Sequence, residues 1–155
     1  MIARAGYGLV YGGGPTGVMG AVADGIWDEG GHVTCVIPRF LQDREGNDDP
    51  RLRKHVVETL QERKTLMAGL SEGFLILPGG LGTYDELFEA ITWSQLEVSN
   101  KKVCVLDIDG FFAPVRDLFT QLIDEQFVEP HHLRRVLVTS SCREAVQYLT
   151  TTQEI

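Results

Sequence analysis

The sequence predicts an α/β fold: a parallel sheet covered by helices on both faces, in a single domain spanning residues 1–155. Short, nearly continuous apolar runs alternate along the chain with stretches of helical periodicity. Strands buried on both faces of a parallel sheet have this apolar character. The length of 155 residues supports one substantial core and leaves little room for a second.

Each predicted element follows from its own pattern. The apolar runs, interpreted as strands, are 8–11, 33–37, 74–77, 103–108 and 136–139. Spaced apolar residues predict helices over 18–28, 53–70, 84–98 and 115–126. The polar, turn-rich segment 42–50 is predicted to be a mobile loop at the carboxyl edge of the sheet, where ligands bind in such folds.

Composition and charge argue against several kinds of partner and cellular location for this protein. A net charge of −8 argues against nucleic acid and anionic membranes as partners. No apolar stretch is long enough to span a bilayer, and no charged-then-apolar leader opens the chain. Cys35 and Cys104 lie within apolar runs, which favours buried thiols in a reducing cytosol. We therefore expect a cytoplasmic protein.

The most informative segment is 78–86, Pro-Gly-Gly-Leu-Gly-Thr-Tyr-Asp-Glu, between a predicted strand and a predicted helix. Backbone N–H groups of Gly79, Gly80 and Gly82, with the positive helix end, can cradle a phosphate. Glu86 would stand one turn into the helix. Thr83 and Glu86 also fit a capping box, in which Thr83 caps the helix and Glu86 bonds back to it. That alternative leaves the run of glycines unexplained.

A cation on an apolar helix face is the second clue. By helical angle Arg63 lies between Leu60 and Met67, with Lys64 at the edge of the stripe. A guanidinium on a packed face is costly unless an anion meets it. The anion is either a ligand or a structural carboxylate, and the pattern alone leaves both open.

A second glycine turn, 12–17, follows the first predicted strand and formally fits G-x-G-x-x-G. The acidic residue that a dinucleotide site needs about 20 positions later is absent, which disfavours a nicotinamide cofactor. Gly13 and Gly14 remain candidates for contact with a phosphorylated small molecule. No Cys or further His stands at ligand spacing around His131 and His132, so no metal site is predicted. Asp107 and Asp109, beside Gly110, are expected to serve the turn itself.

Together these residues resemble the LONELY GUY (LOG) family of cytokinin riboside 5′-monophosphate phosphoribohydrolases, long mislabelled as lysine decarboxylases. The resemblance rests on Pro78-Gly79-Gly80-x-Gly82-Thr83-x-x-Glu86, Glu62-Arg63-Lys64 and the runs 9–14, 17–20, 36–38 and 91–96. A decarboxylase would need a Schiff-base lysine for pyridoxal phosphate. None of Lys54, Lys64, Lys101 and Lys102 stands in a context typical of that site.

The resemblance implies a Rossmann-like fold, a homodimer, and hydrolysis of the N-glycosidic bond of an N6-modified adenosine 5′-monophosphate without cofactor or metal. Arg63 and Glu86 would form the catalytic pair. The residues implied to bind the substrate are Gly13, Gly14, Glu45, Arg63, Lys64, Gly79, Gly80, Gly82, Thr83, Asp85 and Thr92. The alternative is a non-catalytic nucleotide-binding or carrier protein on the same fold.

Two further expectations concern the chain start and assembly. Family members usually open with another strand and helix before the equivalent of 8–11, and Met1 to Ala5 looks like the tail of that helix. The predicted helix 84–98 carries Phe88, Trp93 and Leu96, more apolar surface than one face against a sheet requires. We expect this helix to take part in a dimer interface.

Overall fold

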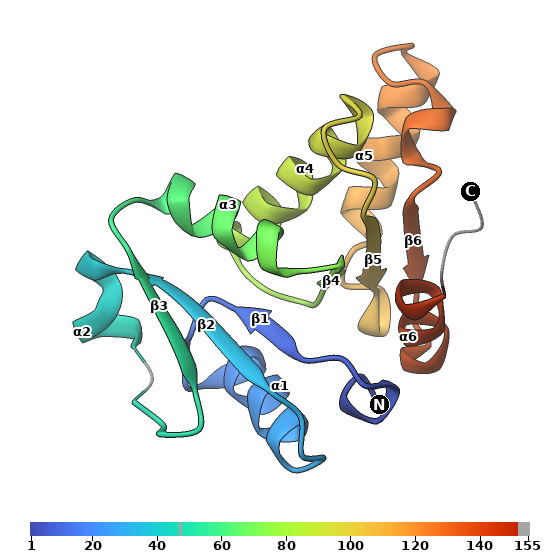
Figure 1. Cartoon of the computed structure of the whole chain (residues 1–155). Helices are drawn as coiled ribbons and strands as arrows, with labels where there is room; N and C mark the ends of the chain where they lie inside the picture. Colours follow the sequence, from blue (N-terminus) through green and yellow to red (C-terminus); the bar gives the residue numbers. More distant parts are fainter. Residues whose placement is uncertain (47, 152–155) are drawn as a thin grey trace. The chain divides into compact units, whose positions relative to one another are not determined.

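The computed structural model describes residues 1–46 and 48–151, with the backbone alone of Glu45. The predicted parallel α/β class is confirmed, since every paired strand runs parallel to its neighbour. Hydrogen bonds group the strands into two three-stranded sheets, ordered β1-β2-β3 and β4-β5-β6. The chain correspondingly forms two compact units, Met1–Ser71 and Glu72–Ile155 (Figure 1).

The first unit is built around β2. Its elements are η1 (Ala3–Ala5), β1 (Leu9–Tyr11), α1 (Gly17–Trp27), β2 (Val33–Pro38), η2 (Arg39–Leu41), α2 (Gln42–Glu45), β3 (Arg53–Val57) and α3 (Leu60–Leu70). Val33, Cys35 and Ile37 of β2 pack with Ala23 and Ile26 of α1 in one core cluster. Alternate residues of a strand face opposite ways, and α3 contacts β2 from the other side of the sheet (Figure 1).

The helix predicted over residues 53–70 was wrong over its first third. Residues 53–57 form the edge strand β3, in which Val56 pairs with Ile37 of β2, and α3 begins only at Leu60. The β-branched pair Val56 and Val57 favours a strand. Thr59, in extended backbone (φ −127°, ψ 162°), starts the helix by accepting a hydrogen bond from the N–H of Glu62. Val56 therefore lies on a strand and not on the helix that carries Arg63.

The second unit has a core on each face of its sheet. Its elements are β4 (Gly73–Ile76), α4 (Leu81–Gln95), β5 (Lys102–Leu106), η3 (Ile108–Gly110), α5 (Ala113–Asp124), η4 (Pro130–Leu133), β6 (Val136–Thr139) and α6 (Cys142–Thr150). Val103 and Val105 of the central strand β5 belong to the cluster beneath α4 and α5. Cys104 and Leu106 belong to the cluster beneath α6. This alternation accounts for the uninterrupted apolar sequence of β5.

Two edge strands of the sheets, β3 and β4, differ in charge. β3, an edge of the first sheet, begins Arg53-Lys54-His55, whereas β4, an edge of the second, reads Gly-Phe-Leu-Ile. The predicted strands agree with the observed ones within one or two residues, apart from β3. Within the described ranges, no helix combines the length and the apolar character needed to cross a bilayer.

Candidate active site

In the first unit, Arg63 reaches the glycine turn that follows β1. A Cβ atom added at Gly12 would lie 1.9 Å from Nη2 of Arg63 and 2.9 Å from its Cζ. The guanidinium therefore lies against the bare backbone at the carboxyl end of β1, the position at which α/β sheets bind ligands. Because Gly12 has no side chain, the guanidinium of Arg63 occupies the space that a Cβ atom would fill.

The surroundings of Arg63 leave part of its hydrogen-bonding capacity unused. Among the described residues, its Nε atom is buried and has no hydrogen-bond partner. A buried donor without an acceptor costs free energy, so a site of this kind favours an anion that accepts the bond. The positive charges of Lys54 and Arg63 also act on nearby Cys35, where burial raises the pKa of the thiol and these two charges partly offset the rise.

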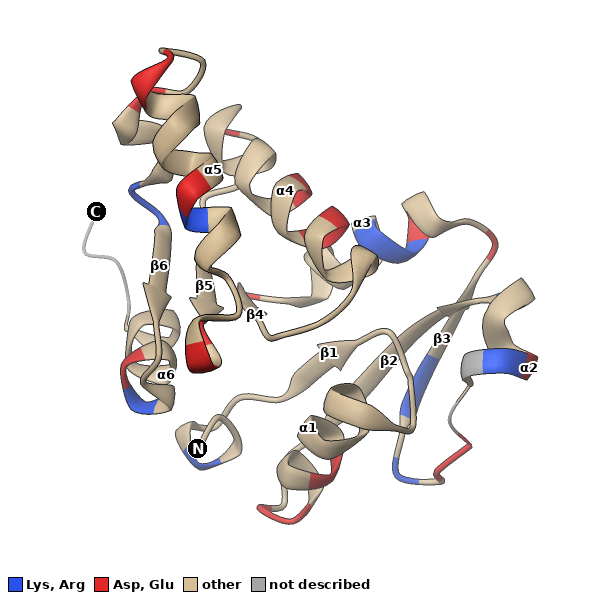
Figure 2. Cartoon of the chain, turned by 180° about the vertical axis from the view of Figure 1, so that it is seen from behind, with Lys and Arg blue, Asp and Glu red and all other residues tan. Residues whose placement is uncertain are grey.

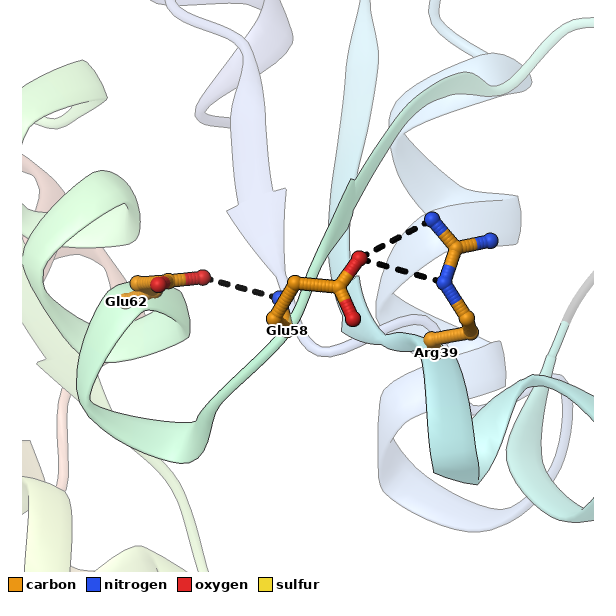
Figure 3. Close-up of polar contacts among 3 residues, drawn as sticks. All are labelled: Arg39, Glu58 and Glu62. Atoms are coloured by element: carbon orange, nitrogen blue, oxygen red, sulfur yellow. Dashed lines mark hydrogen bonds and ion pairs between the residues drawn. The ribbon is translucent and has the colours of Figure 1, made fainter.

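The helix that carries Arg63 is fixed at its start by a set of caps. The N–H of Glu62 donates to Oγ1 of Thr59 at 3.1 Å, and the N–H of Glu58 donates to Oε2 of Glu62 at 2.8 Å. Arg39, which follows β2, donates through Nε and Nη2 to Oε1 of Glu58 at 3.1 and 3.0 Å (Figure 3). Glu62 thus has a structural role, and these hydrogen bonds fix the start of the helix at Leu60, three residues before Arg63.

In the second unit, the start of α4 excludes Thr83 as the residue that caps the helix. The N-cap residue is Gly80, which makes no side-chain hydrogen bond to the first turn. Thr83 lies inside the helix, and its N–H donates to the carbonyl of Gly80 at 3.0 Å. The capping box of Thr83 and Glu86 was therefore wrong, because the helix starts earlier than predicted. A helix start whose N-cap residue is glycine supplies no cap from that residue's side chain, and backbone N–H groups at such a start favour an anion.

The side chain of Thr83 folds back over the glycine turn. A Cβ atom at Gly79 would lie 2.2 Å from Oγ1 of Thr83, so glycine is needed there to admit the hydroxyl. Glu86 is half-buried one turn later, and Asp85 is exposed beside it. The hydroxyl of Thr92 donates to the carbonyl of Phe88 at 2.7 Å along the same helix. Gly79, Thr83 and Glu86 thus belong to one continuous turn and helix.

The remaining predicted site residues lie on several other elements. Gly13 (φ +98°) and Gly14 are buried in the turn that Arg63 contacts, where added Cβ atoms would meet Sγ of Cys35 at 2.3 Å and Cε of Met19 at 2.4 Å. Lys64 is half-buried on α3. The side chain of Glu45 lies outside the described residues. Gly12 was not among the predicted site residues, yet it is the glycine that Arg63 contacts. Its position in the same glycine turn as Gly13 and Gly14 could have indicated it.

Charge around the two glycine turns differs between the units. Figure 2 shows Lys and Arg in the first half of α3 and Asp and Glu along α4. No group of three or more His, Cys, Asp or Glu side chains that could hold a metal ion occurs within residues 1–46 and 48–151. In the described chain, positive charge beside a glycine turn is supplied by Arg63 of α3, which lies against Gly12.

Comparison with known proteins identifies the family. Residues 19–149 match the family described as "Possible lysine decarboxylase". The chain belongs to this family. The resemblance predicted from the sequence is confirmed by relatives that carry the name cytokinin riboside 5′-monophosphate phosphoribohydrolase.

Three such family members illustrate the similarity. LOG of Oryza sativa subsp. japonica is 40% identical over 141 residues, which are 91% of this chain and 58% of the relative. LOG5 of Arabidopsis thaliana is 38% identical over 141 residues, 91% of this chain and 62% of the relative. LOG2 of Arabidopsis thaliana is 39% identical over 132 residues, which are 85% of this chain and 62% of the relative. This chain spans about three fifths of the length of these family members.

Proposed function

We propose that this protein hydrolyses the N-glycosidic bond of an adenosine 5′-monophosphate that carries a substituent on N6. The products are the free base, a cytokinin, and ribose 5-phosphate. The observation that carries the proposal is the start of α4, where Gly80 leaves the helix end without a side-chain cap and Glu86 follows within the second turn. The names of the relatives support the same reaction.

Hydrolysis of this N-glycosidic bond requires a site for the 5′-phosphate and a carboxylate near the ribose. Water adds to C1′ of the ribose, the C1′–N9 bond breaks, and the base leaves with the bonding electrons and takes up a proton. Positive charge develops on the sugar ring as the bond breaks, and Glu86 either stabilises that charge or orients the water. The N–H groups at the start of α4 receive the 5′-phosphate. Arg63 supplies a fixed positive charge for the nucleotide or for the carboxylate.

Lysine decarboxylation fits the described lysines poorly. Nζ of Lys102 donates to the carbonyls of Tyr148 and Thr151 at 2.7 and 2.8 Å at the end of α6. Lys54 forms an ion pair with the exposed Asp48 at 2.7 Å. A Schiff-base lysine needs a neutral amine beside a cofactor site. The amines of Lys102 and Lys54 are instead engaged in these contacts with protein groups.

Product analysis tests the proposal. The protein is incubated with N6-isopentenyladenosine 5′-monophosphate and, separately, with the matching nucleoside, and released base is measured by chromatography. We expect turnover of the monophosphate and a far lower kcat/KM for the nucleoside, because the N–H groups at α4 lose their anionic partner. Binding of the monophosphate without base release would instead identify a carrier. Equal kcat/KM values would rule out the phosphate site at α4.

Substitution of the proposed catalytic pair tests the roles of its members. We expect Glu86→Gln and Arg63→Ala each to lower kcat by on the order of 10²–10³, the usual cost of a lost transition-state charge contact. Circular dichroism and urea unfolding establish that each variant is folded. Wild-type turnover by either folded variant would remove that residue from the mechanism.

We also propose that the protein is a cytoplasmic homodimer that uses α4. Leu96 and Val98, which directly follow α4, are 64% and 71% exposed, and Phe88 on the helix is 36% exposed. Exposed apolar side chains clustered on one helix favour an isologous contact. Buried free thiols such as Cys35 fit a reducing compartment. Light scattering at micromolar concentration decides the assembly: we expect a dimer that Leu96→Glu dissociates, and a stable wild-type monomer would contradict it.

A further inference from the structure

The turn that follows β5 is anchored by a buried carboxylate. Of the charged side chains in the described part of the chain, only that of Asp107 is buried, at 6% exposure. Its Oδ1 accepts a hydrogen bond from the N–H of Phe112 at 2.8 Å, and its Oδ2 lies 3.4 Å from Nη1 of Arg116. Its own N–H donates to the carbonyl of Thr139 on β6 at 2.8 Å. Asp107 therefore ties the turn to the sheet.

The backbone within this turn needs such an anchor. Asp109 (φ 52°) and Gly110 (φ 73°) both adopt the left-handed conformation. A left-handed residue other than glycine is strained and persists when its surroundings hold it in place. The hydrogen bond from Phe112 to Asp107 closes the turn around these two residues. The carboxylate thereby sets the position of Phe112.

Phe112 contacts the first turn of α4 through Tyr84. Its side chain is 1% exposed, and its ring meets that of Tyr84 edge to face with centroids 6.1 Å apart. Tyr84 lies between Thr83 and Asp85, and it packs against the same core cluster as Phe112 and Leu87. A shift of Phe112 therefore acts directly on the helix turn that carries the proposed phosphate site.

We propose that Asp107 is a positioning residue for base release, acting through Phe112 and Tyr84 on the first two turns of α4. This inference rests on the proposed function, because Thr83 and Glu86 stand in those turns. The Asp107 oxygen that accepts from the Phe112 N–H is buried, and the Phe112 ring in turn meets Tyr84 of α4. Loss of this acceptor would therefore reach the helix turns that carry Thr83 and Glu86.

Three variants separate positioning from stability. Asp107→Ala removes the acceptor for the Phe112 N–H. Asp107→Asn keeps that acceptor and removes the charge that faces Arg116. Val103→Ala is the control for stability, since Val103 is fully buried in β5 and shares a core cluster with Phe112 but lies at the end of the strand far from Asp107.

Each variant is measured for kcat and KM on N6-isopentenyladenosine 5′-monophosphate, for urea unfolding, and for amide hydrogen exchange of residues 85–88. We expect Asp107→Ala to lower kcat by on the order of 10², the effect of a misplacement of about 1 Å, with a much smaller change in KM. Exchange at residues 85–88 should accelerate in the same variant. Asp107→Asn should restore both properties, and Val103→Ala should lose stability alone.

The outcomes decide between the alternatives. If Asp107→Ala matches Val103→Ala in kcat and in exchange at 85–88, the positioning role is overturned. If wild type releases no base, the proposed function fails, and the exchange of residues 85–88 still decides whether Asp107 orders α4. Phe112→Leu breaks the next contact while keeping an apolar side chain. It should reproduce the kcat loss of Asp107→Ala, and wild-type kcat in this variant would also overturn the inference.

Discussion

Gly12→Ala tests whether the position of the Arg63 guanidinium matters for function. The new Cβ would lie 1.9 Å from Nη2, whereas an ordinary contact begins at 3.4 Å, so the guanidinium must retreat by about 1.5 Å. The backbone at Gly12 is not left-handed, so alanine meets no backbone strain there. The atoms displaced are the far end of a flexible side chain. The substitution therefore moves the charge and disturbs little else.

The expected result is a large kinetic effect with a small effect on stability. A displacement of this size lowers kcat by on the order of 10². The free energy of unfolding should change by less than about 1 kcal/mol, because alanine restricts the unfolded chain and offsets part of the repacking cost. Steady-state kinetics and urea unfolding measure the two effects. Gly25→Ala is the control, since an added Cβ meets nothing within 4 Å on α1, and it should leave kcat unchanged.

A double-substitution cycle completes the test. If Gly12→Ala acts through Arg63, the double variant Gly12→Ala/Arg63→Ala should be no slower than Arg63→Ala alone. Additive losses would show that the alanine damages the site by another route. A folded Gly12→Ala protein with wild-type kcat would refute the importance of this contact.

Two further predictions concern the thiols and the start of α3. Burial, with a smaller contribution from Glu144, raises the pKa of Cys104 to about 11, and burial raises that of Cys35, so both stay protonated at pH 8. An alkylating reagent at that pH should label only the exposed Cys142 until urea is added, and native labelling of Cys35 would contradict its placement. Thr59→Ala should lower the free energy of unfolding by about 1 kcal/mol through loss of the α3 cap, and unchanged urea denaturation would argue against that cap.

The sequence predicted those parts of the fold that depend on local pattern. Buried strands such as β5 have unbroken apolar sequences, and these were found within one or two residues. The edge strand β3 was missed because it begins Arg53-Lys54-His55, with Arg53 and His55 exposed on a strand that has one neighbour, so no apolar run marks it. The division into two sheets depends on which strands pair across long sequence separations, and apolar runs do not encode partners.

The capping-box pattern shows the same limit at the candidate site. Thr59 with Glu62 and Ser141 with Glu144 are genuine caps, each with the expected side-chain hydrogen bond. Thr83 with Glu86 has the same spacing but lies inside a helix that starts at a glycine. Backbone conformation before the pattern decides its role, and that is a property of the folded turn. The contact between Arg63 and Gly12 likewise requires α3 to be placed on the sheet.

The uncharged edge strand β4 has a consequence for how the protein misfolds. The N–H and C=O groups on the open side of an edge strand can template the addition of another strand, and charged side chains discourage this. β3 carries such charges, whereas Phe74, Leu75 and Ile76 of β4 do not. Short segments rich in β-branched and aromatic residues without charge or proline are also those that form cross-β stacks. Aggregates that grow from partly unfolded chains should therefore nucleate at an uncharged edge such as β4 rather than at β3, and a lysine introduced in β4 would act as a gatekeeper.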